Sequence, residues 1–261
     1  MPAEPIWPPL PERYDRALRE AVAYVRDRFA PAAIIAAGTI LRGAPDPASD
    51  IDLVVVHHEP WRQRLQRFFG DPGVPVEIFV NPPAAIEHAF ASEQARARPV
   101  MAHMIATGTV VFTADGAAAV VGALRDRAAS LLAGPLPPLG AEQLTVMRYA
   151  AATLYEDAVD VAERDPAAAA LLLARAVAGI LDYWFRARGE RLPRSKDLFA
   201  ALASRDPSLA ELAREAAGPG AASITQRLDA GRRLAEQTIG ATGFFEWESE
   251  RQVIAPSPDA V

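Results

Sequence analysis

The chain has 261 residues but contains no cysteine and only one lysine, Lys196. Without cysteine it can form neither a disulfide framework nor a thiolate metal site. It also lacks an apolar run of about 18 residues that is free of charge, which a membrane span would need. The N-terminus shows no basic stretch followed by an apolar one, so it does not resemble a signal peptide. We therefore expect a cytoplasmic protein that has no membrane partner.

The charge balance narrows the classes of partner. The net charge at pH 7 is -6, whereas dedicated nucleic-acid binders are usually basic. Because no basic patch is evident either, a polynucleotide partner is not expected. Hydrophobic residues make up 51% of the chain, which is enough to build ordinary globular cores. The length suits one large domain or two small ones.

The pattern of apolar and turn-forming residues divides the chain in two. Residues 133–140 contain three prolines and two glycines and form the clearest linker. Residues 1–134, before it, mix helical and strand patterns, and residues 141–245 show only helical ones. The expected strands are 32–37, 51–57, 74–80 and 109–112, and a helix is expected at 61–69. We predict an α/β (α+β) domain with a small mixed sheet, followed by an all-α helical bundle.

Two aspartates lie where the second apolar strand pattern begins. Asp50 and Asp52 are two residues apart, so in a strand their side chains point to the same face. Gly38 and Thr39 precede them, at the end of the first apolar run. Glycine lets the backbone approach a phosphate closely, and the amides that open a short helix at Thr39 can donate to an anion. Since carboxylate oxygens suit Mg²⁺, the segment predicts a site for a divalent cation that carries a polyphosphate.

Metal-assisted nucleotidyl transfer needs the triphosphate held, its charge neutralised, and the attacking hydroxyl aligned with the leaving pyrophosphate. A third carboxylate usually completes a two-metal site or acts as the base. Glu77 is the candidate, because it is the only ionisable residue in the apolar segment 74–80 and its strand should lie beside that of the aspartates. Arg42, one turn beyond Thr39, is expected to contact phosphate or support a carboxylate.

These motifs resemble those of the DNA polymerase β-like nucleotidyltransferase superfamily. More narrowly, they resemble its small members with a helical C-terminal domain, such as aminoglycoside nucleotidyltransferases. The resemblance covers about residues 30–113. It implies three carboxylates that act in catalysis and bind one or two Mg²⁺ ions: Asp50, Asp52 and Glu77. It also implies a set of nucleotide-binding residues: Gly38, Thr39, Arg42 and Ser49. An ordinary turn would account for Ser49 and Asp50, but not for Asp52 or Glu77.

The helical half offers two further candidates. Lys196, at a predicted helix start, is expected to reach the nucleotide phosphates; the alternative is a solvated surface lysine. Glu156 shares one helical face with Asp160 and Glu163. That face would contact a cationic acceptor or provide a base; the alternative is an ordinary solvated face.

Together these features predict an enzyme, a Mg²⁺-dependent nucleotidyltransferase. It would transfer a nucleoside monophosphate, AMP from ATP or NMP from another NTP, to a hydroxyl group of a small-molecule acceptor such as an aminoglycoside-like compound. Two alternatives stay open. One is the modification of a protein partner, as in antitoxin-type nucleotidyltransferases, and the other is a module that binds nucleotide without turnover.

Overall fold

The computed structural model describes residues 5–43, 49–218 and 223–251. Contacts within the chain divide it into two compact units, residues 1–135 and 136–261. Each unit has its own hydrophobic core. The boundary between the units falls inside the segment that is rich in proline and glycine.

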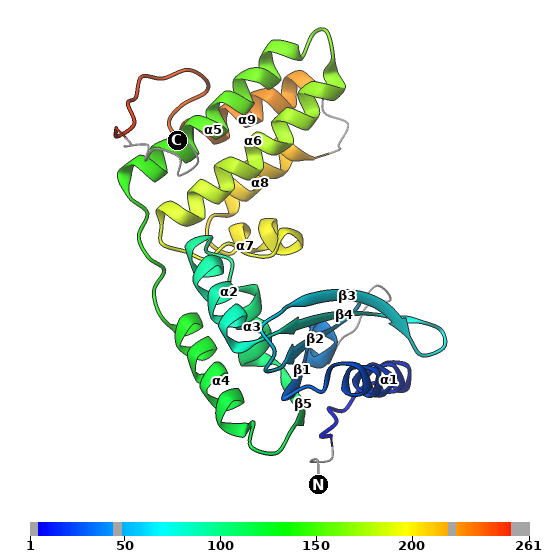
Figure 1. The fold of residues 1–261 in the computed structure, drawn as a ribbon. Helices are drawn as coiled ribbons and strands as arrows, with labels where there is room; N and C mark the ends of the chain where they lie inside the picture. Colours follow the sequence, from blue (N-terminus) through cyan, green and yellow to red (C-terminus); the bar gives the residue numbers. More distant parts are fainter. Residues whose placement is uncertain (1–4, 44–48, 219–222, 252–261) are drawn as a thin grey trace, which may run out of the picture. The chain divides into compact units, whose positions relative to one another are not determined.

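The first unit is built on a five-stranded mixed sheet (Figure 1). The strands are β1 (Ala33–Ala37), β2 (Ile51–Val56), β3 (Gln63–Phe69), β4 (Val74–Asn81) and β5 (Thr109–Thr113). Their order in the sheet is β3-β4-β2-β1-β5. β2 and β4 are parallel, and the other neighbouring strands are antiparallel. The four strands predicted from sequence are confirmed, and so is the mixed character of the sheet.

Helices cover both faces of this sheet. They are α1 (Glu12–Phe29), α2 (Pro83–Ala95), α3 (Val100–Thr107) and α4 (Ala118–Ala133), with the 3-10 turn η1 (Thr39–Arg42) between β1 and β2. On one face, Leu53 and Val55 of β2 belong to the core that includes α1. On the other face, Val54 and Val56 pack with residues of α2, α3 and α4. Because β2 is buried on both faces, its sequence after Asp52 is continuously apolar.

The prediction of a helix at 61–69 is wrong, because residues Gln63–Phe69 form β3, an edge strand. Leu65 and Phe69 are four residues apart, which is helical spacing, but an even spacing also places both on one face of a strand. Both pack against the core beneath α1. All seven residues of β3 pair with β4, from Phe69 opposite Val74 to Gln63 opposite Val80. This non-local pairing decides the structure of the segment.

Among the described residues of the second unit, all regular secondary structure is helical. Its elements are α5 (Ala141–Val161), α6 (Pro166–Ala187), the 3-10 turn η2 (Ser195–Asp197), α7 (Leu198–Ala203), α8 (Pro207–Ala217) and α9 (Ile224–Thr238). Two Asp-Pro pairs set helix starts here. Asp165 accepts hydrogen bonds from the amides of Ala167 and Ala168, and Asp206 accepts one from Leu209. Proline follows each aspartate at the first helical position, where its missing N–H costs nothing.

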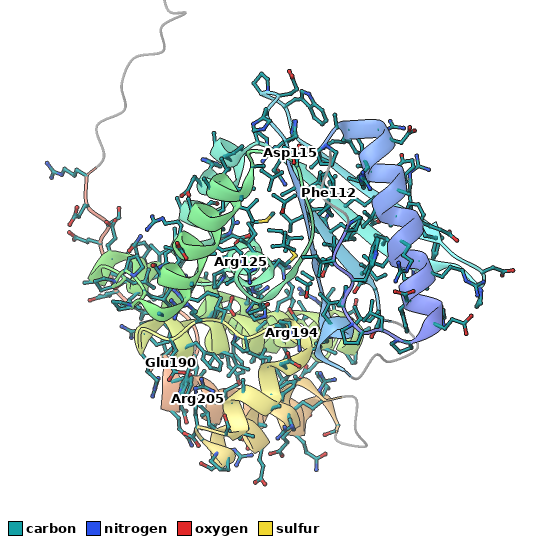
Figure 2. The ribbon with its side chains drawn as sticks, turned by 90° about the horizontal axis from the view of Figure 1, so that it is seen from below. Phe112, Asp115, Arg125, Glu190, Arg194 and Arg205 are labelled. Atoms are coloured by element: carbon teal, nitrogen blue, oxygen red, sulfur yellow. The ribbon has the colours of Figure 1, made fainter. Side chains whose placement is uncertain are left out.

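α6 is the central helix of this unit. By length and composition alone it is apolar enough to cross a membrane. Its buried residues, among them Leu173, Ile180 and Phe185, lie in the core of the second unit, which accounts for the apolar composition. Beyond its end, Glu190 forms an ion pair with Arg205, which follows α7 (Figure 2). The Arg205 guanidinium also lies over the ring of Phe185, 5.5 Å from its centroid, so it ties the ends of the two helices together.

The chain after α9 folds back along α5. The rings of Trp247 and Tyr149 are 5.5 Å apart. Further along, the backbone amide of Glu250 donates to the carboxylate of Glu142, at 3.0 Å. Since the later residue meets the earlier part of α5, the segment 240–251 runs antiparallel to this helix.

Candidate active site

One row of residues crosses four strands of the sheet at the predicted site. Gln66 of β3 is opposite Glu77 of β4, and Glu77 is paired with Asp52 of β2. Asp52 in turn faces Ala37, the last residue of β1. Because neighbouring strands are about 4.8 Å apart, the row spans about 14 Å. Paired residues project to the same side of a sheet, so the side chains of Gln66, Glu77 and Asp52 share one face.

Gly38 brings the backbone directly against the two aspartates. Its φ is +108°, a conformation that L side chains rarely adopt. A Cβ built on Gly38 would lie 3.2 Å from the carbonyl oxygen of Asp50 and 3.5 Å from Oδ2 of Asp52. The chain can pass this close because position 38 has no side chain. Thr39 then opens η1, a turn of four residues, and Ser49, just before Asp50, is buried.

The carboxylates at this site repel one another. The pKa of Asp52 is raised from 3.8 to about 6. Burial is the largest cause, followed by the negative charges of Asp50 and Glu77, while Arg64 opposes the shift. Burial and like charges both disfavour the ionised carboxylate, and a bound cation would relieve both effects. The electrostatics of Asp50 and Asp52 therefore fit a divalent cation.

Glu77 is held from the edge strand. The Arg64 Nη2 donates to both carboxylate oxygens of Glu77, at 2.7 and 2.9 Å. The Gln66 side-chain amide donates to Oε1 as well. The guanidinium also lies over the ring of Phe79, 4.8 Å from its centroid. Arg64 and Gln66 thus draw the carboxylate toward β3, on the opposite side of β4 from Asp52.

A preformed metal site is absent from the described part of the chain, where no three Asp, Glu or His side chains gather closely enough to hold an ion. The donor chemistry nevertheless fits Mg²⁺ at Asp50 and Asp52, since both offer hard oxygen ligands. Glu77 fits as a third ligand only if its carboxylate turns away from Arg64 toward β2.

Arg64 and Gln66 were missed by the sequence analysis because their segment was expected to be helical. A signal for them existed. Two seven-residue segments, 63–69 and 74–80, flank the turn-forming sequence Gly70-Asp71-Pro72-Gly73. Such an arrangement is typical of a β-hairpin and would have placed residues 64 and 66 beside Glu77.

The remaining predicted residues lie outside this row. Arg42 is the last residue of η1, and its side chain is outside the described part of the structure. Lys196 lies in η2 of the second unit and is exposed. Its expected contact with phosphate stays a prediction.

Glu156 lies on α5 and is half-buried. A Cβ built on Gly243 would lie 2.9 Å from its Oε1, so the segment after α9 covers part of this side chain. Asp160 is on the same helix, but α5 ends at Val161, so Glu163 lies beyond it and the expected acidic face is shorter than predicted.

Comparison with known proteins agrees with this geometry. Residues 18–98, which carry most of α1, the first four strands and the row across them, match the family model described as the nucleotidyltransferase domain. The chain is also similar in structure to a nucleotidyltransferase-like protein from Exiguobacterium sibiricum 255-15, with a TM-score of 0.51. The two are 15% identical, and the similarity covers 86% of this chain and 73% of the other. At that identity it shows the fold alone. No curated protein matches the chain.

Residues 18–98 of the first unit therefore carry a nucleotidyltransferase domain, and this match supports the DNA polymerase β-like superfamily that the sequence motifs predicted. Several helices follow it, which confirms the predicted fold class. The narrower resemblance to aminoglycoside nucleotidyltransferases stays a prediction.

Proposed function

We propose that this protein is a Mg²⁺-dependent enzyme that transfers AMP from ATP to a hydroxyl group of a small-molecule acceptor. The observation that carries the proposal is the position of Gly38 against Asp50 and Asp52, at one end of the sheet in a nucleotidyltransferase domain. It puts backbone that can approach a phosphate beside carboxylates that can hold a cation.

Each residue at this site has a distinct task in the proposal. Asp50 and Asp52 would hold Mg²⁺, which when bound neutralises charge on the triphosphate. Gly38 leaves room for a phosphate at the turn, and the Thr39 hydroxyl and nearby amides would donate hydrogen bonds to it. Glu77 would supply the third carboxylate, as a ligand or as a base.

In the proposed reaction, the acceptor oxygen attacks the α-phosphorus of ATP. A new P–O bond forms as the bond from the α-phosphorus to its bridging oxygen breaks, and pyrophosphate leaves with the electron pair. The hydroxyl proton passes to a base, for which Glu77 is the candidate in the first unit. The overall composition, with its net charge of -6, favours a small polar acceptor over a polynucleotide.

The acceptor contacts are proposed for the second unit. Glu156, Asp157 and Asp160 of α5 give that helix an acidic surface, which suits an acceptor that carries amino groups. Lys196 is proposed to contact the phosphates. An aminoglycoside-like compound is therefore the first acceptor class to test.

The test is to incubate the protein with ATP labelled at the α-phosphate, Mg²⁺ and a panel of hydroxyl compounds. Pyrophosphate release should be accompanied by transfer of the label, and by an AMP mass gain, on one acceptor. Asp52→Asn should abolish the transfer. Asp27→Asn serves as a matched control, because Asp27 is an exposed residue of α1 away from the site. Equal transfer by Asp52→Asn and the unmodified protein would contradict the proposal.

A further inference from the structure

The carboxylate of Glu77 already has a cation beside it, Arg64. Glu77 is largely buried, with 16% of its side chain exposed, whereas 63% of Arg64 is exposed. Arg64 reaches Glu77 from the edge of the sheet and is steadied by the Phe79 ring. Glu77 is nearly buried, and a second contact already fixes the Arg64 guanidinium. Forming this ion pair therefore costs less side-chain entropy than forming a fully exposed pair.

The hydrogen bonds distinguish the two oxygens of Glu77. Oε1 accepts from both Arg64 and Gln66, and Oε2 accepts only from Arg64. Since each carboxylate oxygen has two lone pairs, Oε1 is filled and Oε2 keeps one acceptor position. If the carboxylate turns toward Asp52 and a divalent cation, Oε2 therefore gives up one hydrogen bond and Oε1 gives up two, and the positive guanidinium opposes the turn.

We propose that Arg64 is an internal counter-ion of Glu77 that competes with the divalent cation for this carboxylate. Arg64 and Gln66 are then positioning residues, which hold Glu77 on the β3 side of its strand while no metal is bound. The inference rests on the proposed function, because it takes Asp50, Asp52 and Glu77 as the metal ligands. It also accounts for the absence of a three-carboxylate cluster among the described residues.

Competition has a clear consequence for metal affinity. Removing Arg64 takes away the positive charge that is bound to Glu77 and frees the Glu77 carboxylate to turn toward Asp52. Because Arg64 is partly exposed, solvent and salt screen its charge and keep the expected change in affinity modest. Arg64→Ala should therefore bind a divalent cation more tightly, whereas the loss of a purely structural residue would weaken binding.

The experiment is a titration of the full chain with Mn²⁺ in the absence of nucleotide, followed by the electron paramagnetic resonance signal of free Mn²⁺. We expect Arg64→Ala to bind Mn²⁺ about three- to tenfold more tightly than the unmodified protein. Arg64→Lys, which keeps the charge, should stay near the unmodified value. Gln66→Ala, which releases one hydrogen bond but no charge, should give a smaller gain.

Arg67→Ala is the matched control. Arg67 lies on the same strand but faces the other side of the sheet, where its guanidinium lies over Tyr24, 5.0 Å from the ring centroid. Arg67→Ala removes the same charge but leaves the contacts of Glu77 in place, so the Mn²⁺ affinity of this variant should stay within about twofold of the unmodified protein. Thermal unfolding of each variant checks that it is folded.

The outcomes separate the two proposals. Equal or weaker Mn²⁺ binding by Arg64→Ala, or an equal gain in Arg67→Ala, overturns the role of Arg64. If at the same time Asp52→Asn loses Mn²⁺ binding, the metal site and the proposed function still stand. If neither the unmodified protein nor any variant binds Mn²⁺, or if Asp52→Asn binds it as the unmodified protein does, the assignment of the metal ligands is wrong. The proposed competition between Arg64 and the metal is then wrong as well.

Discussion

Asp52 and Glu77 are direct partners in the parallel pairing of β2 and β4. Their Cα atoms are therefore about 4.8 Å apart, and both side chains leave the same face of the sheet. Their carboxylates nevertheless have different surroundings. Asp52 is close to the backbone at Gly38, whereas Glu77 is bound by Arg64 and Gln66. This asymmetry gives each carboxylate a separate experimental signature.

Asp52→Asn should stabilise the fold above pH 6 while it abolishes transfer. The pKa of Asp52 is raised from 3.8 to about 6 on folding, so the native state binds this proton more tightly than the unfolded chain. Ionisation of Asp52 therefore costs stability as the pH rises from about 4 to about 6. The amide cannot ionise, and the expected gain is on the order of 1–2 kcal/mol once solvent screening is allowed for.

Urea unfolding at pH 7.5 and at pH 4 measures this gain. It should be present at pH 7.5 and shrink at pH 4, where the carboxyl is protonated in the folded chain. The exposed Asp27→Asn should show no such difference between the two pH values. A variant that is less stable at pH 7.5 than the unmodified protein would count against the raised pKa.

Divalent-cation binding should weaken below about pH 6. A proton and a metal ion compete for the Asp52 carboxylate, and its raised pKa puts this competition within an accessible pH range. Mn²⁺ titrations between pH 5 and pH 7.5 should show the apparent affinity falling by up to about tenfold for each pH unit below 6. An affinity that is flat over this range would show that Asp52 is not a ligand.

The sequence predicted those parts of the fold that local chemistry controls. Asp165-Pro166 and Asp206-Pro207 are such local signals, because each pair caps and opens a helix, α6 or α8, within a few residues. The sequence also predicted that the strand of Glu77 lies beside the strand of Asp52, because the segment 74–80 is apolar apart from this one acid.

β3 could not be predicted by the same means. Its Leu65 and Phe69 suit a helix and a strand equally, and only the pairing with β4 decides between them. The contacts of Arg64 with Glu77 and Phe79 depend on that pairing, so they too were out of reach of local patterns. The acidic face of α5 was predicted from spacing alone, which gave no sign that the segment at Gly243 covers Glu156.

Gly38→Ala should impair the site more than the fold. The substitution puts a side chain at φ +108° and a Cβ 3.2 Å from the carbonyl oxygen of Asp50. Backbone strain of this kind costs about 1–3 kcal/mol. Because the neighbour that must shift is the backbone beside the metal-binding aspartates, Mn²⁺ affinity and transfer should both fall by at least about tenfold.

Gly116→Ala is the control for this substitution. Gly116 also has a positive φ, +79°, but a Cβ there would have no atom within 4 Å. It should lower stability by a similar amount and leave Mn²⁺ binding unchanged. If both variants reduce metal binding equally, the effect comes from lost stability and not from the contact with Asp50.

Trp247→Ala should destabilise the second unit, although this residue lies beyond the last helix. Its ring packs on Tyr149 of α5 at 5.5 Å, and such aromatic pairs contribute about 0.5–1.5 kcal/mol beyond the area they bury. Phe244→Ala, three residues earlier, is the matched control, because that side chain is 86% exposed. Chemical unfolding followed by circular dichroism should show a loss for Trp247→Ala and a change within about 0.5 kcal/mol for Phe244→Ala. Equal effects would mean that the segment along α5 is held by its backbone contacts, such as that of Glu250 with Glu142, and not by the tryptophan.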